Sequence, residues 1–220
     1  FDSWDHDKEI KLVKNPDYKG NRKVNNDGVT FKIYTDANAA YADVQAGNLD
    51  VMDTVPSADS KTFESDSSVV PYNKAGSVFQ TFTIPSDLEH WKTSTEEGQL
   101  RRQALSMAID RQAICDKVLN GLGTPAVEFT SPKTPGYSDS LKGNENLKYN
   151  KKKAKELWEK ANAISPWTSD DKLTFSYNAD GGAKPIFEAV VNSVKNTLDI
   201  DVTTNPVPTF QEFRNDVTGR

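Results

Sequence analysis

Short runs that alternate apolar and polar residues recur along this chain, and longer segments of helical spacing lie between them. Residues 29–34 have a period of two, which is typical of a strand with one buried face. A helix is expected to follow from Asp36, a suitable N-cap, to Gly47, which can end it. Residues 49–52 then predict another strand. This strand–helix–strand order indicates an α/β fold.

Other elements are expected on both sides of that unit. In the first part of the chain they are a strand over 9–14, a turn over 15–20, a short helix over 57–65 that packs Phe63, and β-rich runs at 69–72 and 77–84 that could pair. Further on, the first expected elements are a helix with Leu100, Ala104, Met107 and Ala108 inward, a helix capped by Asp110, and a long loop over 124–146. A helix over 149–162 follows, with Ala154, Leu157, Trp158 and Ala161 inward, and then a strand over 173–177 and a loop over 178–183. The last expected elements are a helix from Pro185, with Ile186, Val190 and Val194 on its core side and Phe187, Val191 and Leu198 flanking, a strand over 200–202, and a final helix from 210.

The charge balance narrows the function classes. The 220 residues include 27 Lys and Arg against 32 Asp and Glu, for a formal net charge of −5. A nucleic-acid surface needs clustered positive charge to release counterions, so this balance argues against one. The lysines over 151–155 lie among glutamates and indicate a solvated helix face. No apolar run approaches the roughly 20 residues of a membrane span, and we expect any export signal to lie outside this sequence.

Residues suited to metal or covalent chemistry are few. Cys115 is the single cysteine, which excludes an internal disulfide and a multi-cysteine zinc site. It lies in an apolar helix pattern, where a buried thiol is commoner than a nucleophile. His6 and His90 are far apart and are expected at the surface in turns. Gly181-Gly182 opens a helix but lacks the Lys-Ser/Thr of a phosphate-binding loop. We therefore predict no metal, no cofactor and no catalytic residue.

Several segments together resemble the extracytoplasmic solute-binding proteins of ABC transporters, specifically the peptide-binding group (family 5) that contains oligopeptide- and dipeptide-binding proteins. Residues 9–20, EIKLVKNPDYKG, resemble the family's strand and Asn-Pro-x-Tyr-x-Gly turn, with Lys19 where Trp is usual. Residues 46–51, AGNLDV, resemble its Gly-Glu-Ile-Asp-Val segment. The most specific stretch is RQALSMAIDR at 102–111. The motifs follow the family's order over essentially the whole chain.

This resemblance implies a periplasmic-binding-protein-like lobe of type II, with a mixed sheet flanked by helices. In that family two lobes joined by crossing strands close over a ligand. Residues 1–34 would be the end of the first lobe and the crossing-strand region, and residues 35–220 the second, C-terminal lobe, truncated before its return strand. We expect this chain to be part of a protein more than twice as long.

The resemblance also implies which residues lie near the ligand. These expected ligand-binding residues are Thr35, Asp36, Asn178, Asp180, Lys184, Phe210, Arg214 and Val217. Three have plainer alternatives: Asp36 as a helix cap, Phe210 as a core residue and Lys184 as a solvated lysine. The family often has a cationic or imidazole side chain in the loop after Tyr177, where this sequence has Asp180-Gly181-Gly182-Ala183. The preferred peptide length and charge therefore stay open.

The function implied is that of a substrate-binding component of an ABC importer, which captures extended oligopeptides or dipeptides by hinge closure. Its expected partners are a peptide and a transporter permease, with membrane contact only through the permease or a lipid anchor. We expect a monomer in the periplasm or on the outer face of the cell membrane. Two alternatives remain: the same fold binding an oligosaccharide or metal chelate, and a secreted hydrolase.

Overall fold

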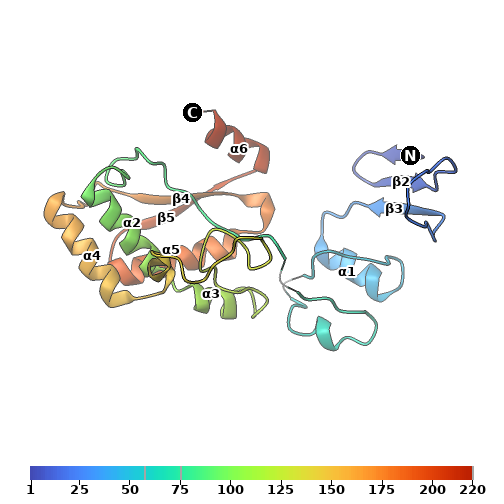
Figure 1. The fold of residues 1–220 in the computed structure, drawn as a ribbon, viewed down its shortest axis with the longest axis horizontal. Helices are drawn as coiled ribbons and strands as arrows, with labels where there is room; N and C mark the ends of the chain where they lie inside the picture. Colours follow the sequence, from blue (N-terminus) through green and yellow to red (C-terminus); the bar gives the residue numbers. More distant parts are fainter. Residues whose placement is uncertain (57, 75, 220) are drawn as a thin grey trace. The chain divides into compact units, whose positions relative to one another are not determined.

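The computed structural model describes residues 1–56, 58–74 and 76–219. The chain divides into two compact units, Phe1–Tyr72 and Asn73–Arg220, which carry separate sheets and helices (Figure 1). The division falls between Tyr72 and Asn73, within the range expected for the second lobe. The lobe boundaries of the whole protein stay a prediction.

The first unit contains an antiparallel sheet in the order β1 (Ser3–Asp5), β2 (Glu9–Val13) and β3 (Gly28–Lys32). Its register pairs Ile10 with Phe31 and Leu12 with Val29, so these apolar side chains share one face of the sheet. The strands expected at 9–14 and 29–34 are confirmed, to within two residues at their ends. The expected turn also forms, where the Asn15 side chain accepts a hydrogen bond from the Asp17 amide at 3.0 Å.

Helix α1 (Ala37–Gln45) follows β3 and has the predicted ends. The Asp36 carboxylate accepts a hydrogen bond from the Asn38 amide at 2.9 Å. Gly47 has a φ of +76°, the left-handed conformation that glycine adopts most readily just past a helix. Phe63 is buried as expected, in a single 3₁₀ turn, η1 (Phe63–Ser65). Ser57, in the helix expected over 57–65, lies outside the described residues.

Three strands expected after α1, the last of them in the second unit, are wrong. Residues 49–52 form no strand, and Val51 is 80% exposed. The described parts of 69–72 and 77–84 form none either. A strand needs a hydrogen-bonded neighbour, and in this sheet β2 pairs antiparallel with β1 and β3. Because residues 49–52 add no strand beside β3, no strand–helix–strand crossover exists around α1.

The second unit contains most of the helices. They are α2 (Glu96–Ala108), α3 (Arg111–Lys117), α4 (Lys151–Ile164), α5 (Lys184–Leu198) and α6 (Phe210–Thr218), with 3₁₀ turns η2 (Asn144–Leu147) and η3 (Ala179–Gly181). Thr95, Asp110 and Asn150 cap the first three by accepting hydrogen bonds from backbone amides inside the helices. The predicted cap at Asp110 and the predicted buried stripe of α4 are both confirmed.

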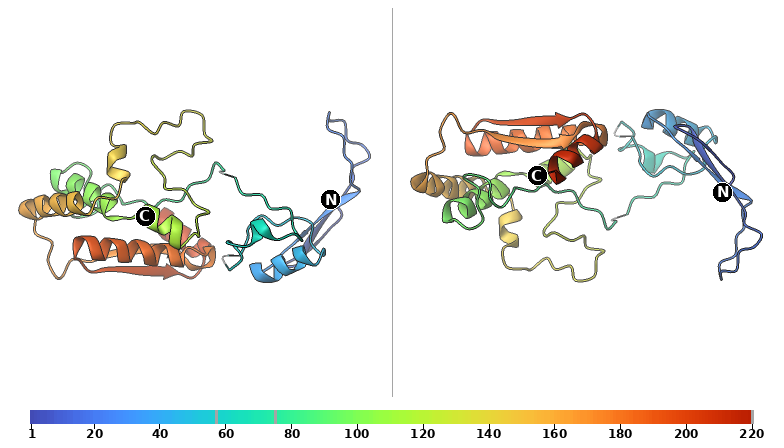
Figure 2. Two further views of the ribbon diagram at one scale, coloured as in Figure 1. Left: turned by 90° about the horizontal axis from the view of Figure 1, so that it is seen from below. Right: turned by 90° about the horizontal axis from the view of Figure 1, so that it is seen from above.

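The crossover that defines the α/β class lies in this unit. Strands β4 (Leu173–Asn178) and β5 (Val202–Val207) pair in parallel, and α5 connects them and lies along them (Figure 2). The α/β expectation is therefore confirmed, from a different segment than 29–52. The strand expected at 200–202 begins two residues later. On α5, Phe187 and Leu198 are core residues rather than flanks, because the helix turns that face toward the strands and α4.

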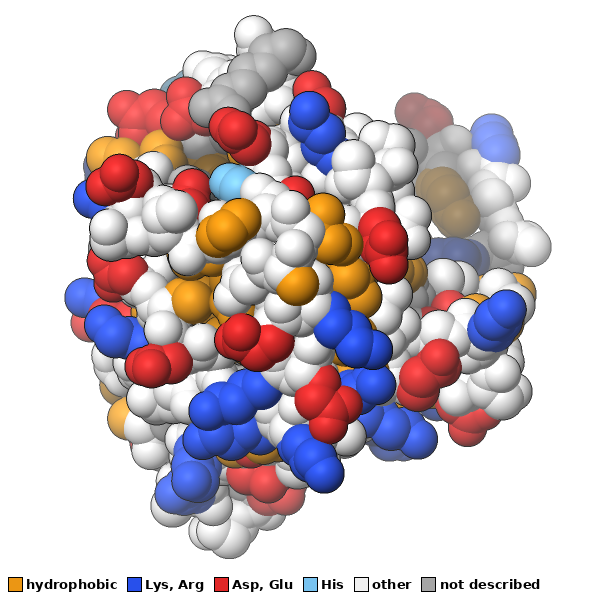
Figure 3. Space-filling model, turned by 90° about the vertical axis from the view of Figure 1, so that its left-hand side faces the viewer, with side chains coloured by type: hydrophobic (Ala, Val, Ile, Leu, Met, Phe, Trp, Pro, Cys, Tyr) orange, Lys and Arg blue, Asp and Glu red, His pale blue; other side chains and the backbone are white. Residues whose placement is uncertain are grey.

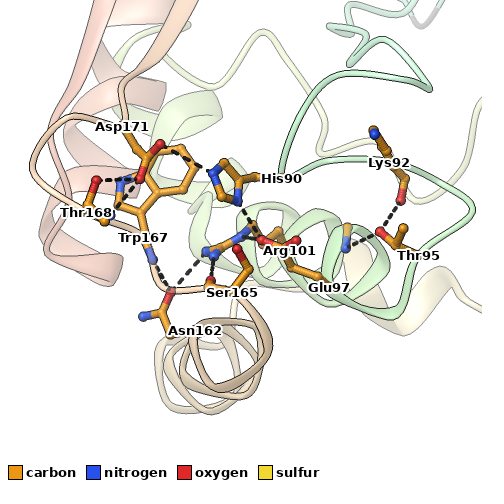
Figure 4. A network of polar contacts seen from close by, with 11 residues as sticks. His90, Lys92, Thr95, Glu97, Arg101, Asn162, Ser165, Trp167, Thr168 and Asp171 are labelled. Atoms are coloured by element: carbon orange, nitrogen blue, oxygen red, sulfur yellow. Dashed lines mark hydrogen bonds and ion pairs between the residues drawn. The ribbon is translucent and has the colours of Figure 1, made fainter.

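An arginine lies inside the core of this unit. Arg101 on α2 has no exposed surface, and its guanidinium is held by Glu97 at 3.0 Å, Asn162 at 3.2 Å and the Ser165 carbonyl at 2.7 Å (Figure 4). It also lies 4.4 Å from the ring centroid of Trp158. This cluster ties α2 to the end of α4.

His90 is placed differently from the expectation. It is in a turn, as predicted, but it is half-buried rather than freely exposed, since its side chain is only 19% exposed. Its Nδ1 lies 2.7 Å from Glu97 and its Nε2 lies 3.4 Å from Asp171 (Figure 4). The long-range packing of α2 against the segment after α4 buries it.

The lysine-rich side of α4 is solvated. Lys151, Lys152 and Lys155 are exposed, and Lys153 pairs with Glu156. Basic and acidic side chains mix over the side of the molecule where α4 lies (Figure 3). The solvated reading of this run is confirmed. Among the described residues, no helix has the length and apolarity needed to cross a membrane.

Candidate functional site

The candidate site lies at the carboxyl ends of the two parallel strands. β4 ends at Asn178 and β5 at Val207, and these two residues are register partners. Both strands therefore deliver the chain to the same edge, where β4 leads into η3 and β5 into α6. In open α/β sheets this edge is where ligands bind, because the loops that follow the strands gather there.

One carboxylate joins the two loops at this edge. Asp180 accepts a hydrogen bond from the Asn178 side-chain amide at 2.7 Å through Oδ1, and from the Phe210 backbone amide at 2.9 Å through Oδ2. The hydrogen bonds from Asn178 and then from Phe210 lower the pKa of Asp180 below its ordinary value. The structure thus brings together three of the predicted residues.

Glycines allow this loop to fold tightly. A side chain at Gly181 would collide with the Asn178 amide group, so the absence of Cβ lets Asn178 close over the turn toward Asp180. Gly182 has a φ of +69°, in the left-handed region. The sequence pattern that resembled a weak phosphate motif is instead explained by backbone geometry.

Helix α6 presents the other predicted residues. A capping box closes its first turn, with the Thr209 hydroxyl accepting from the Glu212 amide and the Glu212 carboxylate accepting from the Thr209 amide. Phe210 is 56% exposed and Val217 is 60% exposed, and Arg214 is also at the surface. The core alternative for Phe210 is therefore wrong. The capping box was readable as Thr-x-x-Glu and was missed.

The remaining predicted residues have local roles. Lys184 is exposed and lies 3.8 Å from Glu188 one turn along α5, as a solvated lysine does. Thr35 and Asp36 belong to the first unit. Asp36 caps α1, and hydrogen bonds from Asn38, first from its backbone and then from its side chain, lower the pKa of Asp36. The helix-cap and solvated-lysine alternatives are thus confirmed, while the ligand roles stay predictions.

A recess in the second unit lies away from this edge. It has a volume of about 390 Å³ and follows the ends of α4 and α5, with Trp158, Trp167, Asp171 and Asp201 among its lining residues. These residues precede β4 and β5, so the recess is at the opposite ends of the strands. Among the residues that the structure describes, no group of three or more His, Cys, Asp or Glu is placed to hold a metal ion.

Comparison with known proteins identifies the family. Residues 1–220 match the family profile "Bacterial extracellular solute-binding proteins, family 5 Middle" over the full length. The chain belongs to this family. The oligopeptide-binding protein AppA of Bacillus subtilis is 30% identical over 223 residues, which cover 94% of this chain and 38% of that protein. The dipeptide-binding protein DppE of the same organism is 29% identical and is covered to 36%. The chain therefore spans little more than a third of these relatives.

Solved structures show the same fold. The periplasmic binding protein DppA of Helicobacter pylori, in complex with the peptide STSA, matches 96% of this chain with a TM-score of 0.76 at 21% identity, and the chain covers 38% of it. AgaA of Agrobacterium, in complex with agropinic acid, matches 99% with a TM-score of 0.70 at 22% identity, and the chain covers 42% of it. The chain has the type II periplasmic-binding-protein fold that the sequence predicted, and family members are solute-binding proteins rather than enzymes.

Proposed function

We propose that the whole protein is the substrate-binding component of an ABC importer and captures oligopeptides or dipeptides in a cleft between two lobes. The observation that carries this proposal is the family match over residues 1–220, together with relatives that are named peptide-binding proteins. A permease would be its transport partner. It would act outside the cytoplasm, as a monomer, either in the periplasm or attached to the membrane by a lipid anchor.

The candidate edge suits an extended peptide. Carbonyl and amide groups of such a ligand can pair with protein backbone at strand ends, so that binding depends little on ligand side chains. Asn178, Phe210, Arg214 and Val217 would line one wall of the cleft. Lys184 would stand at its border, and residues 35 and 36 would contribute where the crossing strands enter the second lobe.

A second cargo class has a specific observation in its favour. A protein of the same fold was solved with agropinic acid, which is not a peptide. The loop after β4 also lacks the cationic or imidazole side chain expected from the family, since it carries Asp180, Gly181, Gly182 and Ala183. A small polar solute is therefore the alternative that the test must include.

The test is a thermal-shift titration of the full-length protein. The ligands are di-, tri- and tetra-alanine, mixed peptide pools, oligosaccharides and nickel–histidine complexes. We expect the midpoint to rise with at least one peptide set, since a ligand that binds only the folded state stabilises it. A rise only with a non-peptide solute, or no rise with any peptide, would overturn peptide binding.

Two phenylalanine variants test whether α6 lines the proposed cleft. Phe210→Ala should weaken the peptide affinity about tenfold, because the variant lacks the aromatic ring that would contact the peptide in the cleft. Phe129→Ala is the matched control, since Phe129 is 73% exposed in the same unit but does not belong to the segments that follow β4 and β5. Equal affinities for wild type and Phe210→Ala would remove α6 from the proposed cleft.

A further inference from the structure

We propose that Asp180 is a positioning residue of the ligand site, which holds the first turn of α6 against the loop after β4 and does not itself contact the ligand. This inference rests on the proposed function for its role in binding. Its structural part, the attachment of α6, stands on contacts within the second unit alone.

Helix α6 is attached to the second unit with little buried surface. None of its residues is buried, and Phe213 is only half-buried. Its N-terminal cap is internal to the helix, because Thr209 and Glu212 satisfy each other. Such a helix gains little from apolar burial, so a hydrogen bond to its first residue has a large share in fixing its orientation.

The loop after β4 supplies that hydrogen bond. The Phe210 amide is an N-terminal donor that has no partner inside the helix, and Asp180 accepts from it across 30 positions of sequence. A carboxylate at a helix N-terminus also interacts favourably with the helix dipole. Asp180 therefore supplies both a partner and a charge to the start of α6.

The other carboxylate oxygen of Asp180 is also hydrogen-bonded within the protein. Oδ1 of Asp180 accepts from the Asn178 amide, and Gly181 leaves the room for that approach. Each oxygen is thus engaged by a protein donor, one from the β4 end and one from the β5 side. Loss of either bond would therefore loosen the wall that α6 and the loop after β4 form together.

The experiment compares Asp180→Ala, Asp180→Asn and the control Asp216→Ala in the full-length protein. Asp216 is an exposed carboxylate on the same helix. Hydrogen exchange is followed by mass spectrometry in peptides that cover residues 205–219 and, as a reference, 151–164. Affinity is measured by calorimetry with tri-alanine.

We expect Asp180→Ala to accelerate exchange at 209–213 and to weaken tri-alanine binding about three- to tenfold, because only the fraction of molecules with α6 in place is competent. Asp180→Asn should keep most of both properties, since its amide oxygen can still accept from Phe210 and Asn178 can rotate its own amide to match. Asp216→Ala should behave as wild type. The reference helix α4 should not change in any variant.

Two results would overturn the inference. One is unchanged exchange at 209–213 in Asp180→Ala. The other is an Asp180→Asn variant that has normal exchange at 209–213 but binds tri-alanine as poorly as Asp180→Ala does. That result would mean that the ligand interacts directly with the carboxylate charge. If the wild type bound no peptide, the proposed function would fail, while the exchange measurement would still decide the role of Asp180 in holding α6.

Discussion

The guanidinium of Arg101 lies 4.4 Å from the ring centroid of Trp158 and 5.1 Å from that of Trp167. One charged side chain is therefore enclosed by two indoles and paired with Glu97, with no surface left to solvent. Removing Arg101 leaves a void and leaves Glu97 with His90 as its remaining ion-pair partner among the described residues, and breaking a buried pair typically costs about 3–5 kcal/mol.

Arg101→Ala should therefore lower the free energy of unfolding by that amount, measured by urea denaturation with the slope unchanged. Lys155→Ala on the exposed face of α4 is the control and should stay within about 0.5 kcal/mol of wild type. A loss under about 1 kcal/mol for Arg101→Ala would mean that the cluster relaxes around the missing side chain.

Gly98 in α2 gives a prediction whose sign opposes helix propensity. Alanine in place of glycine inside a helix normally stabilises it by about 1 kcal/mol. Here a Cβ would run into the backbone of Lys92, which cannot move aside cheaply. Gly98→Ala should instead destabilise the second unit by about 1–3 kcal/mol, as overpacking does. Gly76→Ala is the matched control, because a Cβ there meets nothing within 4 Å. Thermal melts of both variants and the wild type show whether Gly98→Ala lowers or raises the melting midpoint.

Asp66 predicts an acid dependence of the first unit. Hydrogen bonds from Ser68, and then from Gln45 and Tyr41, lower its pKa below the ordinary value of 3.8. A lowered pKa contributes stability that is fully present above the ordinary value and is lost as pH falls below it toward the folded value. The wild type's advantage over Asp66→Asn in the free energy of unfolding should therefore shrink between about pH 4 and pH 2, and it should be constant from pH 5 to 7. Parallel denaturation curves of the two proteins over this range would show it, and a difference that persists unchanged at pH 2 would contradict it.

Local signals predicted much of the fold. The four-residue stripe of α4 and the caps at Asp36 and Asp110 follow from helical spacing and side-chain chemistry, which act within a few residues. Residues 49–52 alternate in the same way as a strand, yet strand formation depends on a neighbour that no local pattern reveals. The burial of Arg101 and His90 was invisible for the same reason, because both depend on the packing of α2 against the segment that follows α4.

The candidate site was also predictable in part, because its residues could be named from the sequence but their contacts depend on long-range packing. The family resemblance predicted Asn178, Asp180 and Phe210 as ligand-binding residues, and in the structure hydrogen bonds join these three residues to one another. That the Asp180 carboxylate accepts from both the Asn178 side chain and the Phe210 backbone amide depends on how the two loops pack, and could be seen only in three dimensions. Whether these residues meet a ligand stays a prediction.

The long segment between α3 and α4 has a consequence for the integrity of the second unit. Contacts on either side of it already join its flanks: the Ser193 hydroxyl donates to the Ala108 carbonyl, the Asn150 amide donates to the Met107 carbonyl, and Arg101 reaches Asn162. A proteolytic nick within 124–143 would leave two pieces that hold each other without a covalent link. The second unit can thus be viewed as two complementing halves, and the exposed residues 139–142 of this segment are a natural place to insert a tag or a reporter domain.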